Sequence, residues 1–374
     1  MIRKTYLDNA ATTQVRPEVI AEMAKVLAED FGNASSSHSF GRHAKSVVEM
    51  ARKSIAKQLN VSAQEIIFTS CGTEADNWIL RSAVRDLGVK RIITGKMEHH
   101  AVLHAAEAIA AEFQIPLEFV RTLPSGNIDL EHLQELLRSG VPTLVSLMHV
   151  NNEIGTVLDL AAVGKLCREN HAYFHSDTVQ SVGKCRFDLQ QLPVDFIVAS
   201  AHKFHGPKGI GFAYVRKGIV LQPMLFGGEQ EKGLRAGTEA VHNIAGMAKA
   251  LELAYEHLED EENDITSLKH YAISQLQQHF PGAKVNGADT FYNIVNVCLP
   301  IAPEKTAMIL FHLDMKGIAV SRGSACQSGS AKPSHVLAEI LSDEDLKKPS
   351  IRISFSHYNT REDIDYLIDV LQSV

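Results

Sequence analysis

The feature that most constrains this chain is an alternation of short apolar runs with helix-length stretches between about residues 45 and 215. Short apolar runs separated in this way are typical of βα units, which pack as a mainly parallel sheet with helices on its faces. The sequence therefore predicts an α/β fold. The expected strands cover residues 65–69, 91–95, 143–149, 172–175, 195–199 and 209–215.

The remainder of the chain predicts a second, smaller unit. Residues 239–280 are strongly helical in pattern, and the region after 281 mixes strands (293–298, 351–355) with helices (304–315, 361–371). A length of 374 residues accommodates about two domains. We expect a large domain over residues 12–255 and a small α+β domain formed by residues 1–11 and 256–374.

Polar residues follow five successive apolar runs of the expected parallel sheet. In open sheets of this kind, ligands bind at the carboxyl ends of the strands. Together these polar residues indicate one ligand-binding pocket, although any one of them alone would be weak evidence for it. They lie at positions 69–73, 97–100, 149–153, 177 with 180, and 200–203.

The first of these positions is suited to an anion. Gly72 and Thr73 open a predicted helix, where backbone N–H groups and the helix dipole can hold a negative charge. Taken alone, Thr73 is more simply an ordinary helix N-cap. Ser200 and His202 could add donors to the same anion.

Asp177 and Lys203 complete the argument for a cofactor. A half-buried carboxylate needs a cationic partner, such as a protonated pyridine nitrogen, and a lysine in an apolar cleft can form a Schiff base. Singly, Asp177 could make a local salt bridge or cap a helix, and Lys203 could be a surface lysine. Together with an anion site they are the set of partners that pyridoxal 5'-phosphate requires.

Composition and patterning argue against several classes of protein. A net charge of -7 does not suit broad nucleic-acid binding. Residues 1–13 do not resemble a signal peptide, and no apolar run reaches the roughly 18 residues of a membrane span. The cysteines lack the spacing of a disulfide framework or a zinc site, so we expect a cytoplasmic protein without a metal. With the charge and the apolar runs, we also expect no nucleic-acid or membrane partner. The cysteines are Cys71, Cys167, Cys185, Cys298 and Cys326.

In its motifs and their order, the chain resembles the cysteine desulfurases of the class V aminotransferase family, in the branch that serves nitrogen fixation and iron–sulfur cluster assembly. The resemblance implies the pyridoxal-phosphate-dependent fold type I, with a mainly parallel seven-stranded sheet. It runs almost from end to end. The motifs are YLDNAATT (6–13), FGNASSSHSFGR (31–42), EIIFTSCGTEADN (65–77), MEHHAVL (97–103), SLMHVNNEIGTV (146–157), HSDTVQSVGK (175–184), AHKFHGPKGIG (201–211), RAGTEAVHNI (235–244), SRGSACQSG (321–329) and SIRISFS (350–356).

The resemblance also implies a role for each site residue. Lys203 would bond to the cofactor, Asp177 would pair with its ring nitrogen, Gln180 would contact its hydroxyl group, and His99 would stack on its ring. Arg352 and Asn152 would bind the substrate carboxylate, a task that suits the planar fork of arginine. The expected phosphate ligands are Gly72, Thr73, Ser200 and His202, joined by Thr238 from the partner subunit of a homodimer.

Cys326 is the implied nucleophile. It would take sulfur from L-cysteine as a persulfide, release L-alanine and pass the sulfur to an acceptor protein. Small neighbours such as Ser324 and Gly329 suit a mobile loop, although without the resemblance an incidental thiol would be the simpler interpretation. The other cysteines fit core or near-core thiols. Cys71 is the exception, because it lies in the expected phosphate loop, where relatives often carry glycine.

Alternatives remain at this point. The same fold supports other reactions, and the thiol of Cys326 argues against an aminotransferase or a kynureninase-like enzyme but not against a selenocysteine lyase. A sulfur carrier with a vestigial site conflicts with the complete residue set. An iron–sulfur scaffold, a tRNA-thiolation relay and a thiamine pathway are all open as acceptors. The chain ends at Val374 without the extension that housekeeping relatives use to contact a scaffold, so docking of that kind is in doubt.

Overall fold

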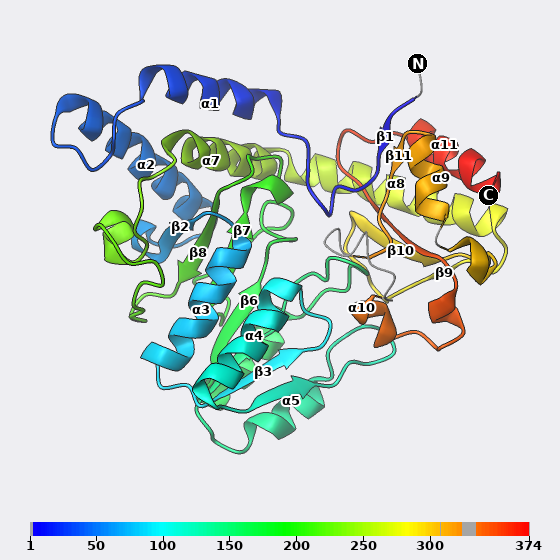
Figure 1. Cartoon of the computed structure of the whole chain (residues 1–374), viewed down its shortest axis with the longest axis horizontal. Helices are drawn as coiled ribbons and strands as arrows, with labels where there is room; N and C mark the ends of the chain where they lie inside the picture. The colour runs from blue at the N-terminus through cyan, green and yellow to red at the C-terminus, as the bar shows by residue number, and fades with distance from the viewer. Residues whose placement is uncertain (1–2, 307, 324–333, 374) are drawn as a thin grey trace.

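A computed structural model describes residues 3–306, 308–323 and 334–373. Within these ranges, seven strands form one sheet in the order β2-β8-β7-β6-β5-β3-β4 (Figure 1). Strand β8 runs antiparallel to both neighbours and the other pairs are parallel. The expected α/β fold with a mainly parallel seven-stranded sheet is confirmed. The strands are β2 (Ile66–Thr69), β3 (Arg91–Gly95), β4 (Leu117–Val120), β5 (Thr143–Ser146), β6 (Tyr173–Asp177), β7 (Phe196–Ser200) and β8 (Gly211–Val215).

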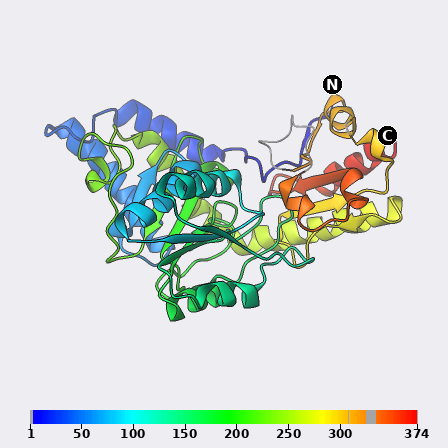
Figure 2. The same ribbon diagram turned by 60° about the horizontal axis from the view of Figure 1, so that its bottom comes forward.

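Helices cover both faces of this sheet (Figure 2), because successive side chains of a strand point to opposite sides. Ile92 packs into the core shared with α3 and α4, whereas Ile93 packs into the core shared with α2, α5, α6 and α7. Each strand is therefore apolar on both sides, as its sequence indicates. The helices are α1 (Pro17–Glu29), α2 (Ser39–Gln58), α3 (Gly72–Asp86), α4 (His100–Phe113), α5 (Leu130–Leu137), α6 (Leu160–Glu169) and α7 (Val241–Glu256).

A second core lies to the right in Figure 1 and unites Leu7 with residues between 265 and 371. Its antiparallel sheet has the order β12-β10-β9, and β1 pairs in parallel with β11 nearby. The domain boundary near residue 255 stays a prediction. The elements of this part are β1 (Thr5–Tyr6), α8 (Leu258–His279), β9 (Lys284–Val285), β10 (Ile294–Cys298), α9 (Ile309–Met315), β11 (Ile318–Ala319), α10 (His335–Ala338), β12 (Ser350–Ser354) and α11 (Arg361–Gln372).

Short 3₁₀ turns connect several of these elements. The turn at Ala201–Lys203 directly follows β7 and presents Lys203 at the carboxyl end of the sheet. The expected helix over 304–315 is divided into a 3₁₀ turn and α9. No helix in the described ranges is long and apolar enough to cross a bilayer. The 3₁₀ turns are Ala63–Glu65, Ala201–Lys203, Gln230–Gly233, Pro303–Lys305 and Asp345–Lys347.

Candidate active site

A cavity of about 230 Å³ lies at the carboxyl ends of β6 and β7. Its lining comes from the strand ends, from the N-terminal segment before α1 and from β12. The side chains predicted from distant parts of the sequence therefore meet in one place. The predicted residues that line it are Gly72, Thr73, His99, Asn152, Asp177, Gln180, Ser200, His202, Lys203 and Arg352.

Lys203 projects its amine from the turn after β7 toward the N-terminal segment. Its Nζ donates hydrogen bonds to the carbonyl oxygens of Ala10 at 2.6 Å and Ala11 at 2.9 Å. Backbone carbonyls are uncharged acceptors, so they hold the amine without placing a negative charge beside it. The amine is thus fixed at the wall of the cavity.

Asp177 ends β6 with only 5% of its surface exposed, and its Oδ1 accepts a hydrogen bond from the N–H of Val179 at 2.9 Å. Burial raises the pKa of this carboxyl group, while the Val179 N–H and the charge of Lys203 lower it by less. A cationic group bound beside Asp177 would offset this desolvation cost.

A second carboxyl group, Asp76 of α3, also lines the cavity. It is fully buried, and neither of its oxygens has a hydrogen-bond partner in the described part of the chain. Burial raises its pKa first, and the nearby Asp177 raises it further. Sequence analysis missed Asp76, because a polar residue inside an amphipathic helix gives no signal of its own.

The amino end of α3 lines the cavity next to the strand ends, because a Cβ at Gly72 would lie 2.6 Å from Val179 and 3.9 Å from Ser200. Cys71 is the N-cap residue, and its side chain makes no capping hydrogen bond in the described structure. Gly72 and Thr73 therefore present first-turn N–H groups to the cavity beside Ser200 and His202. Burial lowers the pKa of His202 to about 3, so its ring is neutral at neutral pH. The arrangement suits an anion bound through neutral donors and the helix dipole.

His99 caps α4, and its Nδ1 accepts a hydrogen bond from the N–H of Ala101 at 3.1 Å. Burial, and then the charge of Lys203, lower the pKa of His99 to about 4. The ring is therefore neutral at neutral pH and carries its proton on Nε2.

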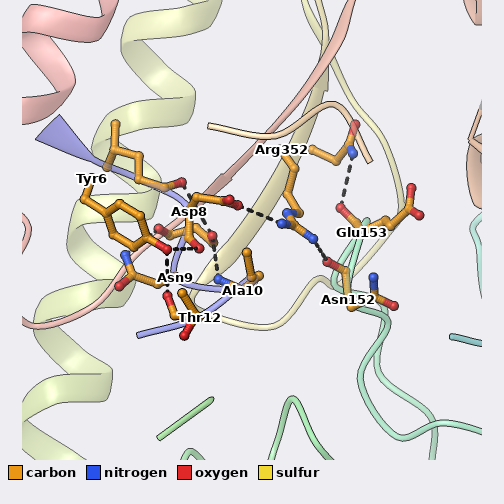
Figure 3. Close-up of polar contacts among 12 residues, drawn as sticks. Tyr6, Asp8, Asn9, Ala10, Thr12, Asn152, Glu153 and Arg352 are labelled. Atoms are coloured by element: carbon orange, nitrogen blue, oxygen red, sulfur yellow. Dashed lines mark hydrogen bonds and ion pairs between the residues drawn. The ribbon is translucent and has the colours of Figure 1, made fainter. Parts of the chain in front are cut away.

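Arg352 lies in the middle of β12 with 1% of its surface exposed. Its Nη2 donates to Asp8 Oδ1 at 2.7 Å, and its Nη1 donates to the carbonyl oxygen of Asn152 at 2.8 Å (Figure 3). A buried guanidinium at the cavity wall is suited to binding a carboxylate.

The N-terminal segment is the part of the site that sequence analysis missed. Ala10 accepts hydrogen bonds from Gln180 Nε2 at 2.9 Å and from Lys203, and Thr12 Oγ1 lies 3.1 Å from His202 Nδ1. Asp8 reaches Arg352, as described above. The motif at positions 6–13 served only to support the family resemblance, because an extended segment has no periodicity that would indicate its position.

Two predicted residues are not placed in this cavity. Thr238 lines a different hollow, together with Ser70 and Arg235, and its assignment to the site of a partner subunit stays a prediction. Cys326 lies outside the described residues. The described ends of its segment both approach Glu153: the Ser334 hydroxyl donates to Glu153 Oε2, and a Cβ at Gly323 would lie 3.1 Å from the same oxygen.

The other cysteines differ in their surroundings. Cys167 and Cys298 are buried, Cys185 is partly buried, and Cys71 lines the cavity. Three of the four thus fit the expectation of core or near-core thiols, and Cys71 stands at the expected phosphate loop.

Comparisons with known proteins agree with this geometry. The sequence matches the family Aminotransferase class-V over residues 5–367. A cysteine desulfurase IscS of Dictyoglomus turgidum is 41% identical over 379 aligned positions, which cover 100% of this chain and 95% of that protein. Among solved structures, a NifS-like protein has a TM-score of 0.90 and 35% identity, with 99% of both chains covered. A structure of SspA in complex with cysteine has a TM-score of 0.82 and 29% identity, covering 96% of this chain and 100% of that one.

Proposed function

Because the chain belongs to the class V aminotransferase family, and within it to the cysteine desulfurases, we propose that it converts L-cysteine to L-alanine and keeps the sulfur as a persulfide on Cys326. The observation that carries this proposal is the convergence of Lys203, Asp177, His99 and Arg352 on one cavity. An amine, an acid, a neutral imidazole and a carboxylate-binding fork are the groups that this chemistry requires.

The residues of the cavity fit pyridoxal 5'-phosphate, on which this family depends. Asp177 is a buried carboxylate that a protonated ring nitrogen would stabilise, and the uncapped start of α3 suits the phosphate. Lys203 and Gln180 would hold the aldehyde and hydroxyl side, and His99 would stack on the ring. When bound, the cofactor supplies an electron-withdrawing ring that weakens bonds at the substrate Cα.

The chain's own groups would then move the protons. Lys203 Nζ, held beside the carbonyls of Ala10 and Ala11, would take the proton from the substrate Cα. The Asp177 carboxylate would keep a proton on the ring nitrogen, which favours the accumulation of electrons in the ring. The neutral ring of His99 would donate a hydrogen bond from Nε2 within the cavity, and the proton that Lys203 took from Cα would return to the carbon skeleton.

Cys326 would make the sulfur transfer. Its thiolate attacks the sulfur of the substrate, a new S–S bond forms, and the Cβ–S bond breaks. The electron pair of that bond stays with the carbon skeleton, which takes up a proton and leaves as alanine. The approach of both Gly323 and Ser334 to Glu153 supports this role, because Glu153 adjoins the cavity residue Asn152.

We also propose that two copies of the chain form the working enzyme. Thr238 lines a hollow outside the cavity of its own chain, so it could complete the phosphate site of a partner. Large aromatic side chains are exposed in and just before α2 and in the loop that precedes the turn at Gln230–Gly233, where a second copy could cover them. They are Phe31 at 71%, Phe40 at 56% and Phe226 at 81% exposure.

The persulfide on Cys326 would pass to an acceptor protein, for which an iron–sulfur cluster scaffold is the candidate that the relatives' names favour. We place this transfer in the cytoplasm, where reducing conditions keep the nucleophile a thiol between turnovers.

Replacement of the nucleophile tests the proposal. Cys326→Ser should keep the bound cofactor and its absorbance but should stop alanine release from L-cysteine, because serine cannot accept sulfur. The matched control is Cys185→Ser. The Cys185 thiol lies outside the cavity, where it donates a hydrogen bond to the Ser181 carbonyl. Undiminished alanine release by Cys326→Ser, measured by amino-acid analysis, would place the nucleophile elsewhere.

A further inference from the structure

We propose that Asp8 is a positioning residue, which holds the Arg352 fork in the orientation that receives the substrate carboxylate. This inference rests on the proposed function, since it assigns to the N-terminal segment a part in recognising the α-carboxylate of an amino acid. It extends the site from the ends of the sheet strands to the N-terminal segment, whose place in the site cannot be predicted from where strands end.

The nitrogens of the Arg352 guanidinium fall into two groups, those with a hydrogen-bond acceptor in the protein and one without. Nη2 is bound to Asp8 and Nη1 to the Asn152 carbonyl, and these acceptors lie on opposite sides of the guanidinium in Figure 3. The third nitrogen, Nε, is buried and has no hydrogen-bond partner among the residues that the structure describes. The fork is therefore fixed by two protein acceptors but still has donor capacity for a ligand at the cavity.

Asp8 can act as a fixed support because its backbone is tied to the strand that carries Arg352. It forms a bridge with Ser354 in β12, and the N–H of Ser354 donates to the carbonyl of Leu7 at 2.8 Å. The Asp8 carbonyl accepts hydrogen bonds from the Tyr6 hydroxyl at 3.1 Å and the Ala11 N–H at 3.0 Å. The carboxylate and the guanidinium are thus held on one local framework.

Without the Asp8 carboxylate, the buried guanidinium of Arg352 would have no anionic partner among the contacts described above. An arginine side chain has several rotatable bonds, and ordering it costs binding free energy unless the protein has already done so. The ion pair supplies that order before the substrate arrives. The same pair compensates the charge of Arg352, which lowers the cost of keeping a guanidinium in a site of 1% exposure.

The two variants Asp8→Ala and Asp8→Asn separate this role from a purely structural one. Asp8→Ala removes the acceptor, and we expect the KM for L-cysteine to rise about tenfold, which corresponds to one charge-assisted contact. We expect kcat to change less than about twofold, because the carboxylate contact is the same in the ground state and the transition state. Asp8→Asn keeps an oxygen for Nη2 and should recover most of the loss.

A comparison of two ligands shows whether the effect acts on the carboxylate. L-alanine has the amine and the carboxylate, and ethylamine has the amine alone; their binding is followed by the absorbance of the bound cofactor in the holoenzyme. Asp8→Ala should weaken L-alanine about tenfold and leave ethylamine unchanged. The control Arg3→Ala breaks another ion pair of the N-terminal segment, the 2.9 Å contact with Asp363, and should change neither.

A double-mutant cycle with Arg352→Gln completes the test. If Asp8 acts through Arg352, adding Asp8→Ala to Arg352→Gln should cause no further loss of L-alanine affinity. Equal weakening of both ligands, additive losses in the cycle, or an unchanged KM in Asp8→Ala would each overturn the proposal. Failure of the wild type to release alanine from L-cysteine would instead refute the proposed function, and the L-alanine titration would still test Asp8.

Discussion

The cavity has two walls that the chain builds differently. One wall, which we call the strand-end wall, includes Asp177 and Lys203. Its central carboxylate, Asp177, is buried beside one backbone N–H and a second carboxyl group, Asp76, whose Oδ1 lies 3.4 Å from His175 Nε2. The other wall, which we call the N-terminal wall, is lined by Ala10, Ala11 and Arg352 and is supported by the rest of the segment 8–13. The carboxylate of this segment, Asp8, already has the Arg352 guanidinium as its partner.

This difference separates two tasks. Burial raises the pKa of Asp177 more than the charge of Lys203 lowers it, so we propose that the strand-end wall holds the cofactor and carries the bond-breaking steps. In the N-terminal wall Asp8 already pairs with Arg352, so we propose that this wall orients the substrate. Substitutions in the first wall should therefore alter the chemical steps, whereas those in the second should alter affinity or stability.

The largest effect should follow Lys203→Ala. The variant lacks the amine that would bond to the cofactor and take the Cα proton, so alanine formation should fall by at least about 1000-fold. The loss of the lysine-bound cofactor absorbance is the direct measurement. Lys208→Ala, in an exposed position of the same loop, is the control and should retain both activity and absorbance. Survival of the lysine-bound absorbance in Lys203→Ala would break the assignment.

Asp177→Asn should have the next largest effect. The amide keeps the shape and an acceptor for the Val179 N–H but removes the negative charge, so kcat should fall about 100-fold while the fold persists. The matched control is Asp195→Asn, which changes a carboxylate that accepts the Phe174 N–H outside the cavity. A kcat equal to that of the wild type would show that the charge of this wall is not required.

The stability of the protein should respond to pH through His205, which follows the Lys203 turn and packs against the N-terminal segment, where its Nδ1 lies 2.8 Å from the Gln14 carbonyl. Burial, and then His357, lower the pKa of folded His205 from 6.5 to about 3. Between these values the unfolded chain binds a proton that the folded chain does not, so this group makes stability fall as pH decreases, by up to about 1.4 kcal/mol per pH unit.

His205→Gln removes this titration. The free energy of unfolding of the wild type relative to the variant should therefore fall by about 2 kcal/mol between pH 7 and pH 5. Urea unfolding of both proteins at the two pH values measures the shift. Parallel pH dependence in the two proteins would contradict the assigned protonation state of His205.

The smallest effect should come from Thr12→Val, which keeps the shape of the side chain but removes the hydroxyl 3.1 Å from His202 Nδ1. Loss of one hydrogen bond of about 1 kcal/mol should weaken the retention of pyridoxal phosphate about fivefold. Dialysis against buffer, followed by measurement of the remaining cofactor, gives the ratio, and Thr12→Ser is the control. A fall in kcat as large as that expected for Asp177→Asn would contradict the distinction between the two walls.

The strand-end wall was predictable because local sequence patterns indicate where a buried strand ends. The strands expected over 172–175 and 195–199 are present as β6 and β7, which extend slightly further and end at Asp177 and Ser200. The edge strand β4 was not predicted, because Glu118 interrupts its apolar pattern and most of its side chains are only half-buried. Edge strands of this kind carry a weaker periodic signal than central ones.

The N-terminal wall was not predictable from local pattern. Asp8 meets Arg352 across a separation of 344 residues, and nothing in the extended segment specifies that contact. The motif at positions 6–13 identified the family but did not indicate where in the site these residues lie. Long-range pairings of this kind depend on the packing of the second core around Leu7.

The hydrogen bonds from Lys203 to Ala10 and Ala11 have a practical consequence for handling the enzyme. Proteolytic trimming within the first thirteen residues would remove no predicted catalytic side chain, yet it would take away the acceptors of the reactive amine and the partner of Arg352. A trimmed preparation would keep Lys203 and Asp177, but it would lose the Leu7 side chain from the second core and the Thr12 contact of His202. Its stability, its retention of cofactor and its turnover should therefore all fall. Intact mass should accordingly be checked before any preparation is judged inactive.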